Sequence, residues 1–461
     1  MTVQLKKSPP SGATAITVID QTGYQALAAG LPIASARWLD TVGFSGAPDS
    51  HALLAAADGS LAQVFAGVAH AHDPFALAAL PLALPEGHYR LAEQGLAIAP
   101  ESAAMSWALG GYGFDRYKPR RRQPARLTLK PDPGAERGLV QANAIAMARD
   151  LINTPAEHMG PQQLAQAARA LARHHGATFR QVQGEALLKQ NFPAIHAVGR
   201  AAGRAPRLIE LLWGKPKHPR LSIVGKGVCF DSGGLDIKGA EGMRLMKKDM
   251  GGAANALALA ATVMALKLPV RLQLLIPAVE TAISGNAYRP GDVIKTRNGL
   301  QIEIGNTDAE GRVILSDALT YAAQSRPELI IDLATLTGAA RVALGPQLPA
   351  LFCRQMAPAR QLVDLGLQLE DPLWHMPLWA PYRSGIESTV GDIVNTGRNT
   401  MAGAINAALF LEYFVPTNQD WLHIDLFAWN DTSRAGRPVG GEAQTIRTLL
   451  AYLQQRFTTP G

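Results

Sequence analysis

Charged side chains alternate with glycines in two short segments in the second half of this 461-residue sequence, residues 225–252 and 305–312. If four carboxylates from these segments met in one cleft, they would repel one another, and some would stay protonated unless cations lay among them. Two divalent ions bridged by shared carboxylates would remove this repulsion and could hold both the attacking and the departing group of a hydrolysis. The charged residues that suggest this chemistry are Lys226, Asp231, Lys238, Asp249, Asp308 and Glu310.

The two lysines strengthen this interpretation. A lysine beside a metal ion can lose its proton and become a neutral ligand, because a nearby cation lowers the pKa of an ammonium group. A second lysine that stays charged can polarise a carbonyl as negative charge develops on its oxygen. The alternative is that residues 231–234 form a turn and that residues 306–311 begin a helix with Asp or Thr as the cap. Either segment alone fits that alternative, but both together with the lysines are hard to explain as turns.

Histidine is absent between His218 and His375, the span in which these polar segments lie. Any metal ion held there must be bound mainly through oxygen atoms, which suits Mg, Mn, or Zn in a two-metal site. The sequence also lacks the Gly-x-x-x-x-Gly-Lys-Ser/Thr loop, the Gly-x-Gly-x-x-Gly turn, the Gly-x-Ser-x-Gly elbow and the His-Glu-x-x-His motif. Nucleotide binding and serine hydrolase chemistry therefore have no support from sequence motifs.

Short apolar runs typical of buried strands alternate with helical patterns, at 221–224, 251–266, 271–276, 313–324 and 329–333. This alternation predicts an α/β fold with a mostly parallel central sheet that helices cover on both faces. In such folds, ligand sites gather in the loops beyond the carboxyl ends of the strands. Asp231 is expected to follow a strand and Asp249 to precede a helix. Asp308 and Glu310 are expected in a loop just before another helix.

Length and composition predict a folded protein with more than one domain. A chain of 461 residues exceeds what one hydrophobic core usually organises, and 47% hydrophobic with 18% charged residues excludes a disordered or collagen-like chain. We expect a smaller N-terminal mixed α/β domain over 1–125, a linker and connecting helix over 126–152, and a larger catalytic domain over 153–461. The boundary follows a basic, proline-rich stretch and a helical pattern that begins near Glu136.

Cysteine content and hydropathy favour an intracellular protein. Cys229 and Cys353 are the two cysteines, which is too few for a disulfide framework and typical of a reducing compartment. The first ten residues have no apolar stretch after Lys6 and Lys7, so no secretory signal is expected. The longest apolar helical run, 253–266, falls short of the roughly 20 residues that a membrane span requires. We therefore expect a cytoplasmic location and no membrane partner.

The excess of basic residues is small for a nucleic-acid-binding protein. Lys and Arg number 44 and Asp and Glu number 37, which gives a formal charge of +7 and permits weak attraction to polyanions. The basic residues gather in the run 116–122, which contains Arg120, Arg121 and Arg122. DNA binding through this run is one interpretation, but a solvated linker between domains is favoured.

The run 306–312, Asn-Thr-Asp-Ala-Glu-Gly-Arg, resembles the signature of the leucine aminopeptidase family, the dizinc cytosol aminopeptidases. The charged residues also match the spacing of that family, because Asp231, Lys238, Asp249 and Asp308 lie 5, 12, 23 and 82 residues after Lys226. The resemblance covers about residues 136–415 and includes the runs 153–156 and 332–338. A seven-residue motif together with five spaced residues is a specific signal.

The resemblance implies a set of ligands for two divalent metal ions, with Zn or Mn expected. Asp231 and Glu310 would bridge both ions. Lys226 and Asp249 would complete the more loosely held site, and Asp308 would complete the tighter one, partly through its backbone carbonyl. The free α-amine of the substrate would bind one of these ions, which explains why such enzymes remove a single residue from the N-terminus.

The resemblance also implies roles in catalysis and in substrate binding. Lys238 would polarise the scissile carbonyl, and Arg312 would hold a bicarbonate ion that acts as general base toward the metal-bridging water. An arginine cannot itself be the base because its guanidinium stays protonated, but it can hold a planar anion through two hydrogen bonds. Leu336 and Gly338 would contact the substrate backbone, and Met246 would line the pocket for the first side chain. Peptides with a free N-terminus would be the substrates, and a homohexamer the assembly.

The segment 421–430 departs from the family pattern. Phe427 stands where the family usually has a small Ala-Gly pair after the aspartate, so it either reshapes the side-chain pocket or points into the core. A preference for leucine therefore cannot be assumed. His423 lies on an apolar strand pattern, which favours a hydrogen-bonded core histidine over a catalytic group. Cys229 lies between two candidate ligands in the sequence, but the family pattern gives it no metal role.

Two other functions compete with that of a metal-dependent aminopeptidase. The first is a DNA-binding accessory protein with a secondary peptidase site, which salt-dependent retention of duplex DNA would favour if neutralising Arg120, Arg121 and Arg122 abolished it. The second is a phosphatase or nuclease with carboxylate-bound metals, which would explain the ions but neither Lys238 nor the full spacing. The aminopeptidase accounts for all of these residues and is the function we expect.

Overall fold

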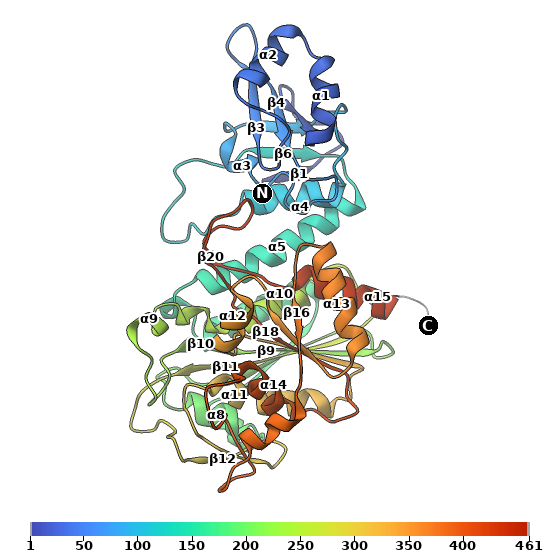
Figure 1. The fold of residues 1–461 in the computed structure, drawn as a ribbon. Helices are drawn as coiled ribbons and strands as arrows, with labels where there is room; N and C mark the ends of the chain where they lie inside the picture. The colour runs from blue at the N-terminus through green and yellow to red at the C-terminus, as the bar shows by residue number, and fades with distance from the viewer. Residues whose placement is uncertain (1, 459–461) are drawn as a thin grey trace. The chain divides into compact units, whose positions relative to one another are not determined.

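The computed structural model describes residues 2–458 and divides into two compact units. Unit 1 comprises Met1–Ala146 with the short segment Thr432–Val439, and unit 2 comprises Met147–Asp431 with Gly440–Gly461. The α/β fold class is confirmed, with the smaller unit at the N-terminus and a larger unit that contains both charged segments (Figure 1). Among the helices of the described residues, none combines the length and the apolar character that crossing a membrane needs.

Unit 1 is a six-stranded sheet with short helices. Its elements are β1 (Val3–Leu5), β2 (Thr14–Ile19), α1 (Gln21–Ala29), α2 (Ile33–Thr41), β3 (His51–Ala55), β4 (Leu61–Gly67), α3 (Leu80–Ala83), β5 (His88–Leu91), α4 (Pro100–Gly110) and β6 (Arg126–Leu129). The strand order is β1-β6-β5-β2-β4-β3, and all neighbours are parallel except β3 and β4. Val64, Tyr89 and Trp107 belong to its buried core. In the described part of unit 1, no group of His, Cys, Asp and Glu side chains lies close enough to hold a metal ion.

Unit 2 is built around a nine-stranded sheet. Its strands are β7 (Thr178–Gln183), β8 (Arg207–Trp213), β9 (Arg220–Gly225), β10 (Gly227–Asp231), β11 (Arg271–Thr281), β14 (Leu329–Ala334), β15 (Ala350–Cys353), β16 (Trp374–Met376) and β18 (Trp421–Asp425). They follow the order β16-β15-β18-β14-β9-β11-β8-β7, and β10 pairs with β11. The central strands β18, β14, β9 and β11 are parallel neighbours. Their carboxyl ends therefore meet at one edge of the sheet, where ligand sites of such folds form.

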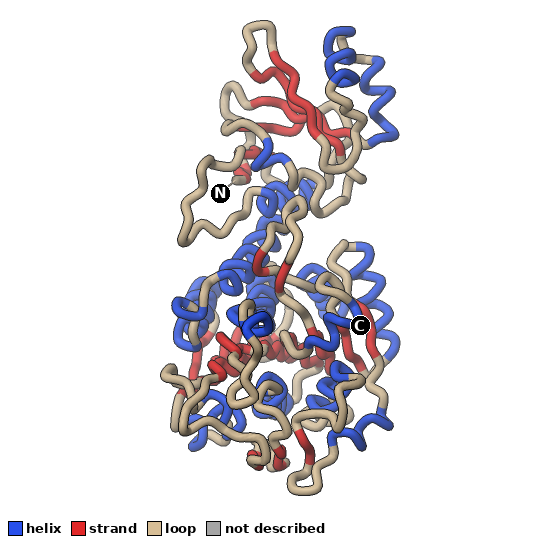
Figure 2. Tube along the Cα trace, turned by 60° about the vertical axis from the view of Figure 1, so that its left-hand side comes forward, coloured by secondary structure: helices blue, strands red, loops and turns tan. Residues whose placement is uncertain are grey.

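Helices cover both faces of this sheet, as the two views show (Figures 1 and 2). Helices α10 (Gly251–Ala265) and α13 (Met356–Gln368) lie on one face, and α8 (Pro193–Gly199), α11 (Glu310–Gln324) and α14 (Gly403–Glu412) lie on the other. The residues of α10 are buried up to Met264, as expected for a helix that is apolar around its whole circumference. The sheet is therefore shielded from water on both sides, which is typical of parallel strands.

The remaining helices and strands complete the chain. They are α5 (Pro133–Asn153), η1 (Ala156–His158), α6 (Pro161–His175), α7 (Ala186–Lys189), α9 (Ala240–Met243), η2 (Met246–Met250), β12 (Val293–Lys295), β13 (Gln301–Glu303), α12 (Gly338–Leu344), η3 (Ala380–Ile386), β17 (Ile393–Val394), β19 (Trp429–Asn430), β20 (Gly440–Gly441) and α15 (Ile446–Thr458). Of these, η2 and α12 supply residues to the site described below.

The predicted strands and helices of unit 2 are confirmed, but one boundary matters for the site. Helix α11 begins at Glu310 rather than at residue 313. Asp308 lies in the preceding loop as expected, whereas Glu310, also expected in that loop, is the first residue of the helix. A carboxylate is stabilised in the first turn of a helix by the partial positive charge of its N-terminus, and this effect explains the earlier start.

Candidate metal centre

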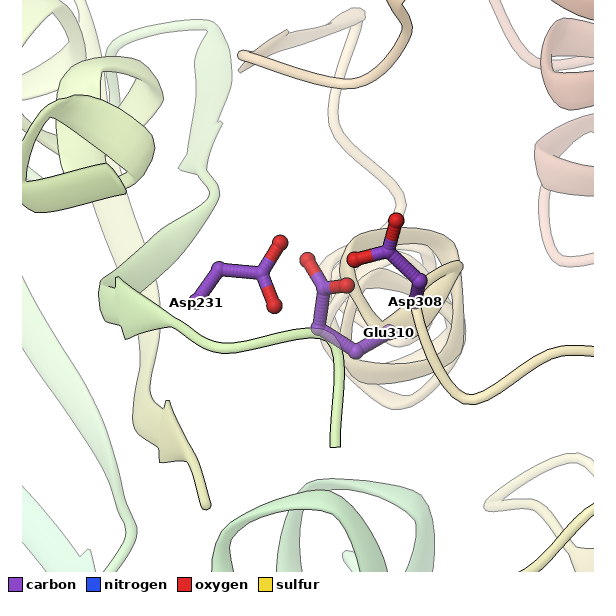
Figure 3. Close-up of side chains that lie close together, drawn as sticks. All are labelled: Asp231, Asp308 and Glu310. Atoms are coloured by element: carbon purple, nitrogen blue, oxygen red, sulfur yellow. The ribbon is translucent and has the colours of Figure 1, made fainter. Parts of the chain in front are cut away.

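Three carboxylates from two distant segments meet in unit 2. Asp231 ends strand β10, Asp308 lies in the loop before α11, and Glu310 begins that helix. One oxygen of each carboxylate lies within 4.8 Å of the other two, and Figure 3 shows the three groups close together. Asp231 and Glu310 are 2% and 1% exposed, whereas Asp308 is partly exposed. This spacing allows one cation to contact all three carboxylates.

Two glycines let the chain turn sharply after Asp231. Gly233 and Gly234 have φ angles of 87° and 68°, which favour glycine over residues with a side chain. A Cβ atom on Gly233 would lie 2.4 Å from the carbonyl oxygen of Asp236. The Gly233 N–H donates a hydrogen bond to Asp231 Oδ1 at 2.9 Å. The turn therefore orients the Asp231 carboxylate.

Thr307 ties the loop of Asp308 to the loop that follows Asp231. Its hydroxyl donates to the carbonyl oxygen of Gly233 at 2.6 Å, and its N–H donates to Asp236 Oδ2 at 2.8 Å. The Asp308 N–H donates to Asn306 Oδ1 at 2.7 Å. Because Thr307 is fully buried, water does not compete with these bonds. The two charged segments are therefore held as one unit.

Lys226 lies on one side of the carboxylates. Its Nζ is 2.8 Å from Asp249 Oδ2 and 2.9 Å from Glu310 Oε1. It also donates to the carbonyl oxygen of Thr335 at 2.8 Å. Gly311 makes this approach feasible, because a Cβ atom there would lie 2.5 Å from Lys226 Cε. Asp249, in η2, is thereby joined to the cluster.

Lys238 lies on the other side of the cluster. Its Nζ is 2.8 Å from Asp231 Oδ2 and also pairs with Asp308. The structure thus brings six of the predicted residues together, namely Lys226, Asp231, Lys238, Asp249, Asp308 and Glu310.

Burial and mutual repulsion disturb the protonation of this cluster. Burial and the nearby Asp231 carboxylate raise the pKa of Glu310 to about 8 and that of Asp308 to about 6. Burial also raises the pKa of Asp249. Burial alone would lower the pKa of Lys226, but the surrounding carboxylates raise it above its ordinary value. The lysines therefore do not neutralise the acidic groups fully, and bound cations would favour the ionised carboxylates.

The donor set fits a pair of divalent ions. Within residues 2–458, the buried Glu310 Oε2 has no hydrogen-bond partner, and a buried carboxylate oxygen without a partner is costly unless a cation or water contacts it. Carboxylate oxygens with one amine suit Mn or Zn. The pKa of Lys226 is raised here, so its neutral form requires the positive charge of bound ions beside it.

A pocket of about 640 Å³ opens beside the cluster. Its wall includes Met246, Leu336 and Gly338, the three residues predicted to contact the substrate, and Asp231 and Lys238 also line it. Met246 comes from η2, Leu336 lies in the turn between β14 and α12, and Gly338 is the first residue of α12. A cavity of this size is typical of sites for small molecules.

Asp425 and Thr335 also hold this wall through hydrogen bonds, and the sequence patterns do not predict these contacts. Asp425, at the end of β18, accepts hydrogen bonds from the N–H groups of Leu336 and Thr337 at 3.0 and 3.1 Å. The Thr337 hydroxyl donates to Asp425 Oδ2 at 2.6 Å. The Thr335 hydroxyl donates to Asp249 Oδ1 at 2.9 Å. A lone aspartate after an apolar run gives no signal for partners 88 residues earlier in the chain.

Arg312 lies two residues into α11 and is 8% exposed. Its Nη1 donates to the carbonyl oxygen of Asn395 at 2.8 Å. Among the described residues, its Nε has no hydrogen-bond partner. Burial lowers the pKa of Arg312 to about 10, with Asp425 and Glu310 opposing this shift. The guanidinium therefore stays charged at neutral pH and has a donor to offer an anion.

Phe427 lies in the wall of the pocket and is 9% exposed. Lys248 Nζ lies 4.7 Å from the centroid of its ring, and the guanidinium carbon of Arg341 lies 4.8 Å from it. Burial lowers the pKa of Lys248 to about 8. The ring therefore shapes the pocket, and it brings two basic residues there that sequence reasoning missed.

His423 is a core histidine, as predicted. Its Nδ1 is 2.6 Å from Asp332 Oδ1, it is fully buried, and its ring stacks with those of Phe352 and Trp421. The Cys229 thiol donates to the carbonyl oxygen of Gly227 at 3.7 Å, and burial raises its pKa well above the ordinary value. Cys229 is therefore a protonated, buried thiol.

Comparison with known proteins identifies both parts of the chain. Residues 146–450 match the catalytic domain of the cytosol aminopeptidase family, and residues 15–130 match the N-terminal domain of M17 aminopeptidases. A probable cytosol aminopeptidase of Syntrophotalea carbinolica is 42% identical over 365 residues, which cover 75% of this chain and 73% of that protein. One from Roseiflexus castenholzii is also 42% identical, with 75% and 74% covered.

Solved structures agree with this assignment over nearly the whole chain. The crystal structure of a cytosol aminopeptidase from Coxiella burnetii is 45% identical with a TM-score of 0.94, and 99% of each chain is covered. A bottromycin maturation enzyme in complex with Mn is 31% identical with a TM-score of 0.86, covering 96% of this chain and 99% of that one. The chain therefore belongs to the cytosol aminopeptidase family and is a metal-dependent aminopeptidase of the leucyl type.

Proposed function

We propose that this aminopeptidase uses two divalent ions, with Asp231 and Glu310 as the bridging ligands. Lys226 and Asp249 would complete one site, and Asp308 would complete the other. The observation that supports this proposal is the convergence of three carboxylates within 4.8 Å, with the buried Glu310 Oε2 left without a hydrogen-bond partner in the described chain. Zn and Mn both suit these ligands.

Bound divalent ions lower the pKa of water and polarise a carbonyl, which is the chemistry that peptide hydrolysis needs. Lys238 supplies a charged ammonium that donates to the carbonyl oxygen of the first peptide bond as negative charge develops there. Burial alone would lower the pKa of Lys238, but Asp231 and Asp308 raise it above its ordinary value. Lys238 is therefore protonated and can act as this donor.

The turn at residues 336–338 binds the substrate backbone, with Leu336 and Gly338 in contact. Asp425 keeps this turn in place through the two N–H groups and the hydroxyl that it accepts from. Met246 lines the same pocket. Because the pocket lies directly beside the carboxylates, a peptide whose free amine reaches the cluster places its first residue in the pocket.

In this proposal Arg312 would hold a bicarbonate ion, which would supply a general base for the attacking water. The guanidinium is buried, charged, and has an Nε donor without a partner among the described residues. A planar anion can accept two hydrogen bonds from such a group. Replacing Arg312 with Ala should make the rate insensitive to added bicarbonate, and an unchanged bicarbonate dependence would contradict this role.

We also propose a homohexamer in the cytoplasm, in line with the resemblance to hexameric cytosol aminopeptidases. Val342 and Trp379 are 85% and 54% exposed, and contact with another copy of the chain would remove such apolar side chains from water. Sedimentation equilibrium should give a mass six times that of the 49.0 kDa chain. A monomer or dimer at micromolar concentration would contradict the assembly.

The alternative of a DNA-binding accessory protein has less support. Arg120 pairs with Asp115 and donates to the carbonyl oxygens of Gly111 and Gly113. Arg122 donates to the carbonyl oxygen of Leu84. Two arginines of the basic run are therefore engaged within unit 1, which reduces the charge available to phosphate groups.

The function is tested by removing the metal and restoring it. The protein is treated with a chelator, and Mn, Zn, Co and Mg are added back separately before hydrolysis of amino-acid anilides is measured. We expect no hydrolysis after chelation, recovery with Mn or Zn, and a metal content of two ions per chain in the recovered enzyme. Full activity of the chelated protein, or one ion per chain at full activity, would contradict the proposal.

A further inference from the structure

Two cations lie beside Phe427 in the wall of the pocket. Lys248 Nζ is 4.7 Å and the Arg341 guanidinium carbon 4.8 Å from the ring centroid, and all three residues line the pocket. Lys248 comes from η2 and Arg341 from α12, so the aromatic ring joins them across the pocket wall. Cation–π contacts of this kind hold flexible basic side chains in place.

Neither cation forms an ion pair with a carboxylate of the described chain. In the described part of the protein, Lys248 and Arg341 make no ion pair and no side-chain hydrogen bond. Lys248 is only 6% exposed, and a buried ammonium without a partner is costly. Lys226, by contrast, lies 2.8 and 2.9 Å from two carboxylate oxygens. The charge of Lys248 is therefore available to a ligand in the pocket.

The acidic groups nearest to Lys248 are already engaged. Asp249 accepts from Thr335 and pairs with Lys226. Both oxygens of Asp425 accept hydrogen bonds from the turn at residues 336–337. Glu241, which also lines the pocket, is exposed to solvent and makes no ion pair with either cation. A carboxylate that enters the pocket thus meets two basic groups that form no ion pair within the described chain, with Asp249 and Asp425 acting on Lys248 only as nearby charges.

The position of Lys248 relates it to the first residue of a substrate. It directly precedes Asp249, whose carboxylate belongs to the cluster. The amine and the side chain of an N-terminal residue leave the same carbon atom, so a side chain next to the amine-binding cluster faces the adjoining wall. Phe427, Lys248 and Met246 line this pocket together with Asp249 of the cluster.

We propose that this pocket selects peptides whose first residue is Asp or Glu, with Lys248 as the main specificity determinant and Arg341 as a second one. The inference rests on the proposed function, because it requires the free amine of the substrate to bind at the cluster. Phe427 supports the selection by positioning both cations and by closing the space that a small residue would leave open.

The test compares the anilides of Glu, Gln and Leu. An anilide has no free α-carboxylate, so the side chain of the Glu anilide carries the only carboxylate among these substrates. Glu and Gln have nearly the same shape, so the ratio of their kcat/KM values measures the effect of charge, and a folding defect in a variant cancels from this ratio. We expect the wild type to prefer Glu over Gln by about tenfold, as for a charge-assisted contact. The difference should lie mainly in KM, because the side chain is bound alike before and during the reaction.

Variants of Lys248 and of Arg341 measure the effect of each cation on this ratio, and a variant of the neighbouring Lys247 serves as the control. Lys248→Gln should reduce the Glu-to-Gln ratio to about one, and Arg341→Gln should reduce it by roughly twofold, because Arg341 is exposed. Lys248→Glu should shift the preference toward Lys and Arg anilides. Lys247→Gln is the control, since Lys247 donates to the carbonyl oxygen of Asn153 at 2.8 Å and does not line the pocket. It should leave the ratio unchanged.

The outcomes distinguish this inference from the proposed function. If no anilide is hydrolysed with metal restored, the proposed function fails. If Leu and Gln anilides are hydrolysed but the wild type shows no preference for Glu, or if Lys248→Gln keeps that preference, only the selection of acidic residues is overturned. Inhibition by free glutamate that is stronger than by glutamine, and lost in Lys248→Gln, would support the inference from binding alone.

Discussion

Two buried carboxylates of the central sheet have opposite surroundings. Asp332, in β14, is fully buried and accepts hydrogen bonds from the Trp421 indole and from His423 Nδ1, both at 2.6 Å. Asp231, at the end of β10, is 2% exposed and has the carboxylates of Asp308 and Glu310 within 4.8 Å. The chain supplies donors for both carboxylates, since Asp231 accepts from the Gly233 N–H and pairs with Lys238, but it surrounds Asp231 alone with further acids.

This difference separates a structural cluster from a functional one. A buried charge is tolerated when it is paired and hydrogen-bonded, and Asp332 meets that condition. Around Asp231, four carboxylates face two ammonium groups, so two negative charges remain when all are ionised. Such an excess requires cations from outside the chain. Changes to the two clusters should therefore affect different properties.

The largest effect is expected from Glu310→Ala. The change removes a carboxylate that would bridge both ions, so hydrolysis should fall by roughly a thousandfold or more. Metal content, measured on the purified variant by mass spectrometry, should drop below two ions per chain. An active variant with two ions would show that Glu310 is not a bridging ligand.

A volume-matched variant, Glu310→Gln, tests the excess of charge itself. In the metal-free protein it removes one acid from a repulsive group without leaving a cavity. Its free energy of unfolding should therefore be equal to that of the wild type or higher, as measured by urea denaturation in the presence of chelator. A loss of several kcal/mol would mean that Glu310 stabilises the fold in the way that Asp332 does.

Asp332→Ala should have the reverse outcome. It leaves the buried His423 and Trp421 without their shared acceptor, so the free energy of unfolding should fall by about 3–5 kcal/mol. Metal content per folded chain should stay the same, because Asp332 is not part of the cluster. A variant of normal stability that binds less metal would erase the distinction between the two sites.

Lys238→Ala distinguishes residues of the candidate metal centre that act on the substrate from residues that bind the ions. Lys238 pairs with Asp231 and Asp308, but its proposed role is to donate to the substrate carbonyl. We expect kcat to fall by roughly a hundredfold while both ions are retained. The same assays applied to Lys226→Ala should show a loss of metal, since Lys226 is a proposed ligand. Unchanged kcat in Lys238→Ala would mean that another group polarises the carbonyl.

The sequence was sufficient to predict the elements that carry the centre. Apolar runs marked β9, β11 and β14, and glycines beside the charged residues marked the turns after them. Polar residues that follow parallel strands gather at one edge of a sheet, so their meeting could be anticipated. The start of α11 could not be predicted. The sequence placed both Asp308 and Glu310 in a loop, and only the backbone shows that Glu310 belongs to the helix.

Residues that act through distant contacts were the ones missed. Asp425 accepts hydrogen bonds from the turn at 336–337, and Phe427 makes cation–π contacts with Lys248 and Arg341. Each of these contacts joins elements separated by many residues, and no local pattern encodes such a pair. Lys248 is an ordinary basic residue in the sequence, and its significance appears only once its missing counter-charge and its place in the pocket are known.

The smallest expected effect concerns the pH dependence of the structural cluster. Burial alone would lower the pKa of His423, but Asp332 raises it above the ordinary value of 6.5. A raised pKa in the folded state means that the folded chain binds this proton more tightly than the unfolded chain. The resulting stabilisation is complete below the unfolded pKa and is lost as pH rises through the folded pKa.

His423→Gln isolates this contribution, because the acids of the metal centre titrate alike in both proteins and cancel from the difference. The difference in unfolding free energy between wild type and variant, measured without metal from about pH 5 to about pH 9, should be largest at the acidic end and should shrink as pH rises. In His423→Gln, Asp332 loses a charged partner but keeps the hydrogen bond from Trp421. The loss of unfolding free energy should therefore be smaller than in Asp332→Ala. A difference that grows with pH would mean that His423 is buried in its neutral form, and that the pairing of Asp332 relies on neutral donors alone.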